Sequence, residues 1–77
     1  MSQRLATAFS NNVRLRMREL GINQKDLAVR LKVGESFVSQ MLSGHRHPGL
    51  ESLGSFGKAL GVEPAELLRE KKFAKNA

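Results

Sequence analysis

The sequence predicts a compact all-α domain of five helices. Apolar residues recur at spacings of three and four along most of the chain, which is typical of helices with one buried face. Glycine or proline separates these stretches, and nowhere do apolar and polar residues alternate as they would in a half-buried strand. With 77 residues, the chain has the length of one small domain, whose core is necessarily modest.

The first helix is predicted from five apolar residues that share one face over about four turns: Leu5, Phe9, Val13, Met17 and Leu20. Ser2 is one candidate N-cap, and residues 10–12 (Ser-Asn-Asn) offer a second inside the pattern. Gly21 stands where a left-handed residue commonly ends a helix.

Asn23 is a suitable N-cap for the second helix. The apolar face of that helix consists of Leu27, Ala28 and Leu31. Residues 32–34 form a turn, in which Val33 is expected to enter the core and Gly34 to serve as the next N-cap. The third helix then buries Val38, Met41 and Leu42 and ends near Gly44.

A basic loop over residues 45–49 precedes the fourth helix. The inward residues of the fourth helix are expected to be Leu50, Leu53, Phe56 and Leu60. Gly57 leaves room for a close neighbour, and Pro64 suits the first turn of a short fifth helix. Leu67 and Leu68 are expected to face inward from that fifth helix.

Composition points to an anionic partner. Thirteen lysines and arginines against seven acidic residues give a net charge of +6 and a pI near 10.6. Such an excess favours nucleic acid through steering and counterion release, although charge also serves solubility alone. The absence of cysteine excludes disulfides and suits a reducing cytoplasm. The N-terminal residues lack the basic region, apolar block and cleavage site of a signal peptide, so none is expected. No apolar run approaches the roughly 20 residues that span a bilayer.

Residues 23–44, NQKDLAVRLKVGESFVSQMLSG, resemble the helix-turn-helix of the Cro and phage-repressor type, the XRE family. The shared features are the Asn-Gln pair that opens the second helix, Leu27-Ala28, Val33, Val38, Met41 and Gly44. The resemblance runs from about residue 13 to residue 68, because residues 50–68 are similar to the fourth and fifth helices of the family. It implies a lambda-repressor-like domain over residues 1–69. The polar composition of the residues that follow predicts a flexible basic tail over residues 70–77.

The resemblance implies a sequence-specific transcriptional regulator that binds double-stranded DNA with residues 35–43 in the major groove. A repressor is the expected type, acting as a homodimer on a pseudo-palindromic operator in the cytoplasm, at the nucleoid of a bacterium, and encoded by the bacterium or a phage. The alternatives are an antitoxin or other protein-interaction module with secondary DNA binding, or one domain of a longer repressor. An enzyme is not expected, since no nucleophile is paired with a base.

Four residues are candidate base readers on the outer face of the third helix: Glu35, Ser36, Ser39 and Gln40. Gln40 can bond adenine at N6 and N7, and Ser36 can bond either kind of base. Ser39 could instead reach sugar or phosphate. Glu35 either accepts from cytosine N4 or only complements the helix dipole. Phe37 is either a core aromatic or a contact to a thymine methyl.

The candidate phosphate ligands are Asn23, Gln24, Lys32, Ser43, His45 and Arg46. The start of the second helix favours anions through its exposed N–H groups, and a guanidinium matches phosphate oxygens. Lys32 departs from the family pattern, which often has glycine there, and would be strained in the left-handed region. Neither a metal nor another cofactor is expected, because two histidines without a nearby carboxylate or cysteine make a poor site.

The expected dimer surface involves the fifth helix and the tail, with Leu67, Leu68 and Phe73 as candidates. A second departure from the family concerns an Arg–Glu pair that some relatives form between the first and third helices. Met17 and Leu42 stand at the equivalent positions here, so an apolar contact is expected instead.

Overall fold

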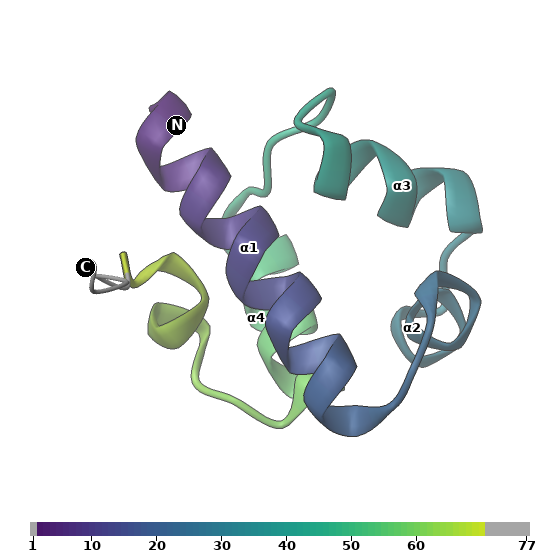
Figure 1. Cartoon of the computed structure of the whole chain (residues 1–77). Helices are drawn as coiled ribbons and strands as arrows, with labels where there is room; N and C mark the ends of the chain where they lie inside the picture. Colours follow the sequence, from purple (N-terminus) through teal and green to yellow (C-terminus); the bar gives the residue numbers. More distant parts are fainter. Residues whose placement is uncertain (1, 71–77) are drawn as a thin grey trace.

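A long first helix crosses the molecule, and three of the four other elements pack directly on it (Figure 1). The computed structural model describes residues 2–70. These residues form α1 (Gln3–Leu20), α2 (Gln24–Leu31), α3 (Glu35–Ser43), α4 (Leu50–Leu60) and a short 3-10 helix, η1 (Pro64–Leu68). In the view of Figure 1, α2 and α3 lie to one side of α1, η1 lies to the other, and α4 passes behind α1.

The all-α prediction is confirmed for the described residues, where no strand is present. The fifth helical segment, however, is a 3-10 helix, so four α-helices are described rather than five. Its hydrogen bonds join residues three apart, from Glu66 N to the Glu63 carbonyl at 2.9 Å and from Arg69 N to the Glu66 carbonyl at 3.4 Å. A five-residue segment that opens on proline is too short to establish the longer α-helical pattern.

The start of α1 decides between its two candidate caps. Leu5 N donates to Ser2 Oγ at 3.2 Å, so Ser2 is the N-cap and the second candidate was wrong. Ser10 and Asn12 lie inside the helix and make tertiary contacts. Ser10 Oγ donates to the Leu42 carbonyl at 2.7 Å, and Asn12 Nδ2 donates to carbonyls of the C-terminal segment.

The core contains most of the apolar residues expected there, in one cluster drawn from all five helical segments. Three expectations were wrong: Leu5 is 37% exposed, Val33 is 37% exposed, and Leu50 is 88% exposed. Leu5 lies in the first turns of α1, and Leu50 is the first residue of α4, so both belong to helix ends. Val33 belongs to the turn before α3 and lines a shallow surface hollow with Phe37 and Phe56.

Two glycines of α4 stand in opposite environments. A methyl group on Gly57 would come within 2.8 Å of the Val62 carbonyl oxygen and 3.2 Å of Pro64 N, so the expected close approach is confirmed. A methyl group on Gly54 would meet no atom within 4 Å.

We therefore expect Gly57→Ala to destabilise the domain by about 1–3 kcal/mol, because backbone would have to shift. Gly54→Ala should stabilise it by about 0.5–1 kcal/mol through helix propensity alone. Urea unfolding followed by circular dichroism measures both. Equal effects of the two substitutions would contradict this account of Gly57.

The turn between α2 and α3 contains a strained residue. Lys32 ends α2 with φ 60° and ψ 43°, and it is the only non-glycine residue with positive φ among those described. Lys32 therefore adopts the left-handed conformation in which the sequence predicted it to be strained. A side chain in this region costs roughly 1–2 kcal/mol.

Lys32→Gly should raise the free energy of unfolding by about 0.5–1 kcal/mol, since relief of strain exceeds the added entropy of glycine in the unfolded chain. For a domain of this size, Tm should rise by about 2–8 °C. Lys32→Ala is the matched control, because it removes the same charge and keeps the Cβ atom. If Lys32→Ala stabilised the protein as much as Lys32→Gly, charge rather than strain would be the cause.

The C-terminal segment is held against α1. Asn12 is buried, and its Nδ2 donates to the carbonyls of Leu67 at 2.9 Å and Arg69 at 2.8 Å. Glu70, which the sequence places at the start of the tail, forms an ion pair with Arg4 at 2.6 Å. Residues 71–77 lie outside the described part of the chain. Between residues 2 and 70, no helix is long and apolar enough to cross a membrane.

Candidate nucleic-acid interface

The α2–α3 pair is held together by its apolar sides. Leu27 and Ala28 of α2 are 0% and 3% exposed, and Val38 of α3 is 0% exposed. Met17 and Leu42 are both buried in the same cluster, as expected for an apolar replacement of the Arg–Glu pair. This packing turns the opposite side of α3 toward solvent.

The four candidate base readers all lie on the exposed part of α3. Glu35, Ser36, Ser39 and Gln40 are each exposed. Phe37 is half-buried and packs against the core cluster, so its ring acts mainly as a core aromatic. The two ion pairs of the described residues involve other carboxylates, and Glu35 therefore stands at the start of α3 without a cationic partner there.

The basic loop after α3 folds back onto that helix. Arg46 N donates to the Gln40 carbonyl at 3.2 Å, and Arg46 Nε donates to the Gln40 side-chain oxygen, also at 3.2 Å. The guanidinium carbon of Arg46 lies 5.2 Å from the centre of the Phe37 ring. Ser43 Oγ lies 2.7 Å from His45 Nδ1. Candidate phosphate ligands and a candidate base reader thus share one surface.

A basic hollow lies at the start of α2. It has a volume of about 180 Å³ and is lined by Arg14, Met17, Arg18, Ile22, Gln24 and Leu42. The sequence pointed to Gln24 but assigned no role to Arg14 or Arg18. Their spacing of four residues, with Met17 between them on the buried side, was the available signal. Arg16 is engaged elsewhere, since its Nε donates to the Leu60 carbonyl at 2.8 Å.

Asn23 and Lys32 mark the two ends of α2. The Asn23 side-chain oxygen accepts from Asp26 N at 2.8 Å, and Asp26 Oδ2 accepts from Asn23 N at 3.0 Å. This capping box commits the Asn23 oxygen to the helix and leaves its amide nitrogen as the group that could meet an anion. Lys32 is exposed at the other end.

The three residues expected at a dimer surface have different environments. Leu67 is 2% exposed and belongs to the core of the domain. Leu68 is half-buried and packs against the core from outside. Phe73 lies outside the described residues.

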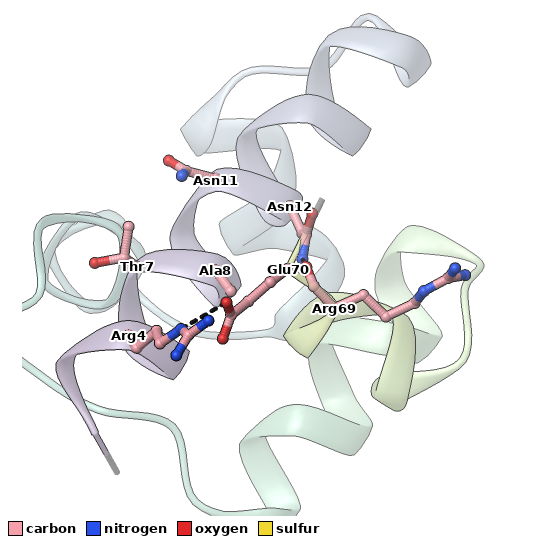
Figure 2. A pocket seen from close by; sticks show the side chains of 7 residues that line it. All are labelled: Arg4, Thr7, Ala8, Asn11, Asn12, Arg69 and Glu70. Atoms are coloured by element: carbon pink, nitrogen blue, oxygen red, sulfur yellow. Dashed lines mark hydrogen bonds and ion pairs between the residues drawn. The ribbon is translucent and has the colours of Figure 1, made fainter. Parts of the chain in front are cut away.

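A larger hollow lies away from α2 and α3. It measures about 380 Å³ and is lined by Arg4, Thr7, Ala8, Asn11, Asn12, Arg69 and Glu70 (Figure 2). The Arg4–Glu70 ion pair crosses it. Among the described residues, no group of three histidine or acidic side chains is arranged to hold a metal ion.

Comparison with known proteins agrees with this geometry. The sequence profile of the helix-turn-helix family matches residues 13–67, which include α2, α3 and their turn. The chain belongs to the helix-turn-helix family. The resemblance of residues 23–44 to the Cro and phage-repressor type is thereby confirmed.

Relatives of this helix-turn-helix protein have regulatory names. This chain is 29% identical to control protein C.BamHI from Bacillus amyloliquefaciens over 69 aligned residues. The alignment covers 88% of this chain and 85% of the relative. It is 27% identical to the restriction-modification controller protein C.AhdI from Aeromonas hydrophila, with a TM-score of 0.74 over 80% of this chain and 94% of that one.

Two further solved structures share the fold. The clp gene regulator ClgR from C. glutamicum is 26% identical, with a TM-score of 0.75 and 83% of each chain covered. The hypothetical transcription factor NHTF from Neisseria has a TM-score of 0.84 over 94% of this chain and 83% of that chain, at 24% identity, and this likeness concerns the fold alone. The similarities together support a DNA-binding regulator of the helix-turn-helix type.

Arg18→Ala should weaken binding to all duplex sequences alike and reduce the salt dependence of log K by about one unit per protomer, if the basic hollow holds a phosphate. Titration of labelled duplexes at several salt concentrations measures this slope. Lys58→Ala is the matched control, because this substitution removes the same charge from an exposed residue of α4 that lies outside the hollow. Equal slopes for the two variants would rule out a phosphate contact by Arg18.

Proposed function

We propose that this protein is a sequence-specific DNA-binding transcription regulator, a repressor that binds a pseudo-palindromic operator as a homodimer. The observation that carries the proposal is the exposed polar side of α3, which is mounted on a buried α2–α3 contact. In a helix-turn-helix, the second helix enters the major groove and the first crosses the backbone. The regulatory names of the relatives support the same function.

In this proposal, α3 supplies the base contacts. Ser36 and Gln40 are the main readers, since both are exposed on the side of α3 away from the core. Ser39 lies beside them and contacts a base edge or the adjoining sugar. Glu35 accepts from a cytosine amino group or, through repulsion from phosphates, disfavours non-cognate sites.

The phosphate contacts flank α3 on both sides. On one side are the amide group of Asn23, Gln24 and the basic hollow at the start of α2, where the helix dipole favours an anion. Lys32 adds a charge in the turn. On the other side are Ser43, His45 and Arg46, in the loop that folds back onto α3.

A homodimer follows from the small number of base contacts that one short helix can make. Two half-sites about one helical turn apart multiply the contacts and restore specificity. Leu68 and the neighbouring surface of η1 are the described residues that we assign to the contact. Repression requires only that the bound dimer occupies DNA that the polymerase needs, so a domain of this size suffices for it. Such a regulator acts in the cytoplasm, where its operator is.

Selection of bound duplexes from a random pool tests the proposal. We expect an enriched site with two inverted half-sites, and a protein–DNA complex of two protomers by light scattering. Failure to enrich any sequence would contradict sequence-specific binding, and a single unrepeated half-site would contradict the homodimer. A protein partner that stays bound in high salt while no duplex is enriched would favour a protein-interaction module instead.

Gln40→Ala should cost about 1–3 kcal/mol on the selected site and relax the preference at one base pair of each half-site. Gln3→Ala is the matched control, because Gln3 is also exposed but lies at the start of α1. Fluorescence anisotropy with cognate and scrambled duplexes measures both variants. If Gln40→Ala weakened cognate and scrambled DNA equally, Gln40 would not be a reader.

A further inference from the structure

We propose that Arg46 positions the side chain of Gln40 so that the two residues present mainly hydrogen-bond donors, and that this Gln40–Arg46 pair reads a guanine in each half-site. The inference rests on the proposed DNA-binding function and specifies the base that one part of α3 selects. It differs from the simplest expectation for an isolated glutamine, which is adenine.

The chemistry of the two side chains determines which amide atom faces Arg46. A guanidinium carries N–H donors and no acceptor. The Gln40 atom that lies 3.2 Å from Arg46 Nε must therefore be the oxygen, because an amide nitrogen in that place would set donor against donor. The Gln40 NH2 group is consequently turned away from Arg46.

Arg46 is held in this place by more than one contact. Its backbone N–H donates to the Gln40 carbonyl, which anchors the start of the loop on α3. Its guanidinium lies over the Phe37 ring, 5.2 Å from the centre, and this ring is itself packed on the core. Phe37 and Gln40 are three residues apart and so are neighbours on the helix surface. Buried Pro48 anchors the far end of the loop.

This arrangement changes what Gln40 can recognise. An unengaged glutamine bonds adenine by accepting from N6 and donating to N7. Here one of the two lone pairs of the oxygen is bonded to Arg46, and the positive charge beside that oxygen disfavours the approach of the N6 amino group of adenine, which is also a donor. Guanine offers two acceptors, O6 and N7, at the same edge. The amide N–H of Gln40 and the outer N–H groups of Arg46 complement that edge.

Competition between two duplexes tests the inference directly. From the selected site, we would make a pair that differs only at the base pair whose preference Gln40→Ala relaxes, with guanine in one duplex and adenine in the other. The wild-type protein should prefer guanine by about 10-fold in Kd, within the range of a good bidentate contact. In Arg46→Ala the Gln40 oxygen is released, and the preference should fall to about one or reverse toward adenine.

Two controls separate positioning from loss of charge. Lys58→Ala removes one positive charge from exposed α4 and should weaken both duplexes by the same factor, which leaves the guanine preference intact. In a Gln40→Ala background, adding Arg46→Ala should change the base preference less than it does in the wild-type protein, since the pair is already broken. Thermal melting of each variant confirms that it is folded.

Three results would overturn the inference and leave DNA binding itself intact. In the first, Arg46→Ala weakens both duplexes equally and lowers the salt slope by about one unit, so that Arg46 is only a phosphate ligand. In the second, Gln40→Ala retains the full guanine preference, so that Arg46 reads alone. In the third, the wild-type protein selects a base other than guanine at this position. Absence of any selected sequence would instead refute the proposed function.

Discussion

The contact between Phe9 of α1 and Phe56 of α4 is the interaction on which the rest of the structure depends. Both rings are almost fully buried, and they meet edge to face with centres 5.1 Å apart and planes at 72°. A chain of 77 residues without cysteine has no cross-link to supplement its core, so burial of these two aromatics carries much of its stability. The α2–α3 pair packs on both α1 and α4, and the direction of α3 therefore depends on this contact.

Polar side chains of α1 also hold the helices together, through hydrogen bonds to carbonyls of the other elements. Ser10 donates to the Leu42 carbonyl near the end of α3, and Arg16 donates to the Leu60 carbonyl at the end of α4. Asn12 donates to the Leu67 carbonyl near the end of η1 and to the carbonyl of Arg69, which follows η1. The last carbonyls of a helix lack partners within it, so one helix supplies donors to the C-terminal ends of three others. These bonds join elements that are far apart in the sequence, which helps a small core to define one arrangement.

A side-chain hydrogen bond between two segments is also present on the surface that we assign to DNA. Gln40 and Arg46 lie six residues apart, in a helix and in the loop that follows, and they form one bonded unit over Phe37. A reader held in this way loses less conformational entropy on binding than a freely rotating side chain would. It also presents a different pattern of donors and acceptors. The specificity of such a helix therefore depends on the loop that covers its flank as well as on its own outward residues.

The sequence by itself determined the four α-helices and most of their ends: Gly21, Asn23, Gly34 and Gly44 each terminate or begin a helix as predicted, because capping depends on local backbone geometry. The exposed side of α3 was also predictable, since it follows from which residues face the core. Only the tertiary structure decided that Asn12 binds the C-terminal segment, that Leu50 is exposed and that Arg46 holds Gln40. These outcomes depend on which surfaces the packed helices bring together, and no local spacing encodes that.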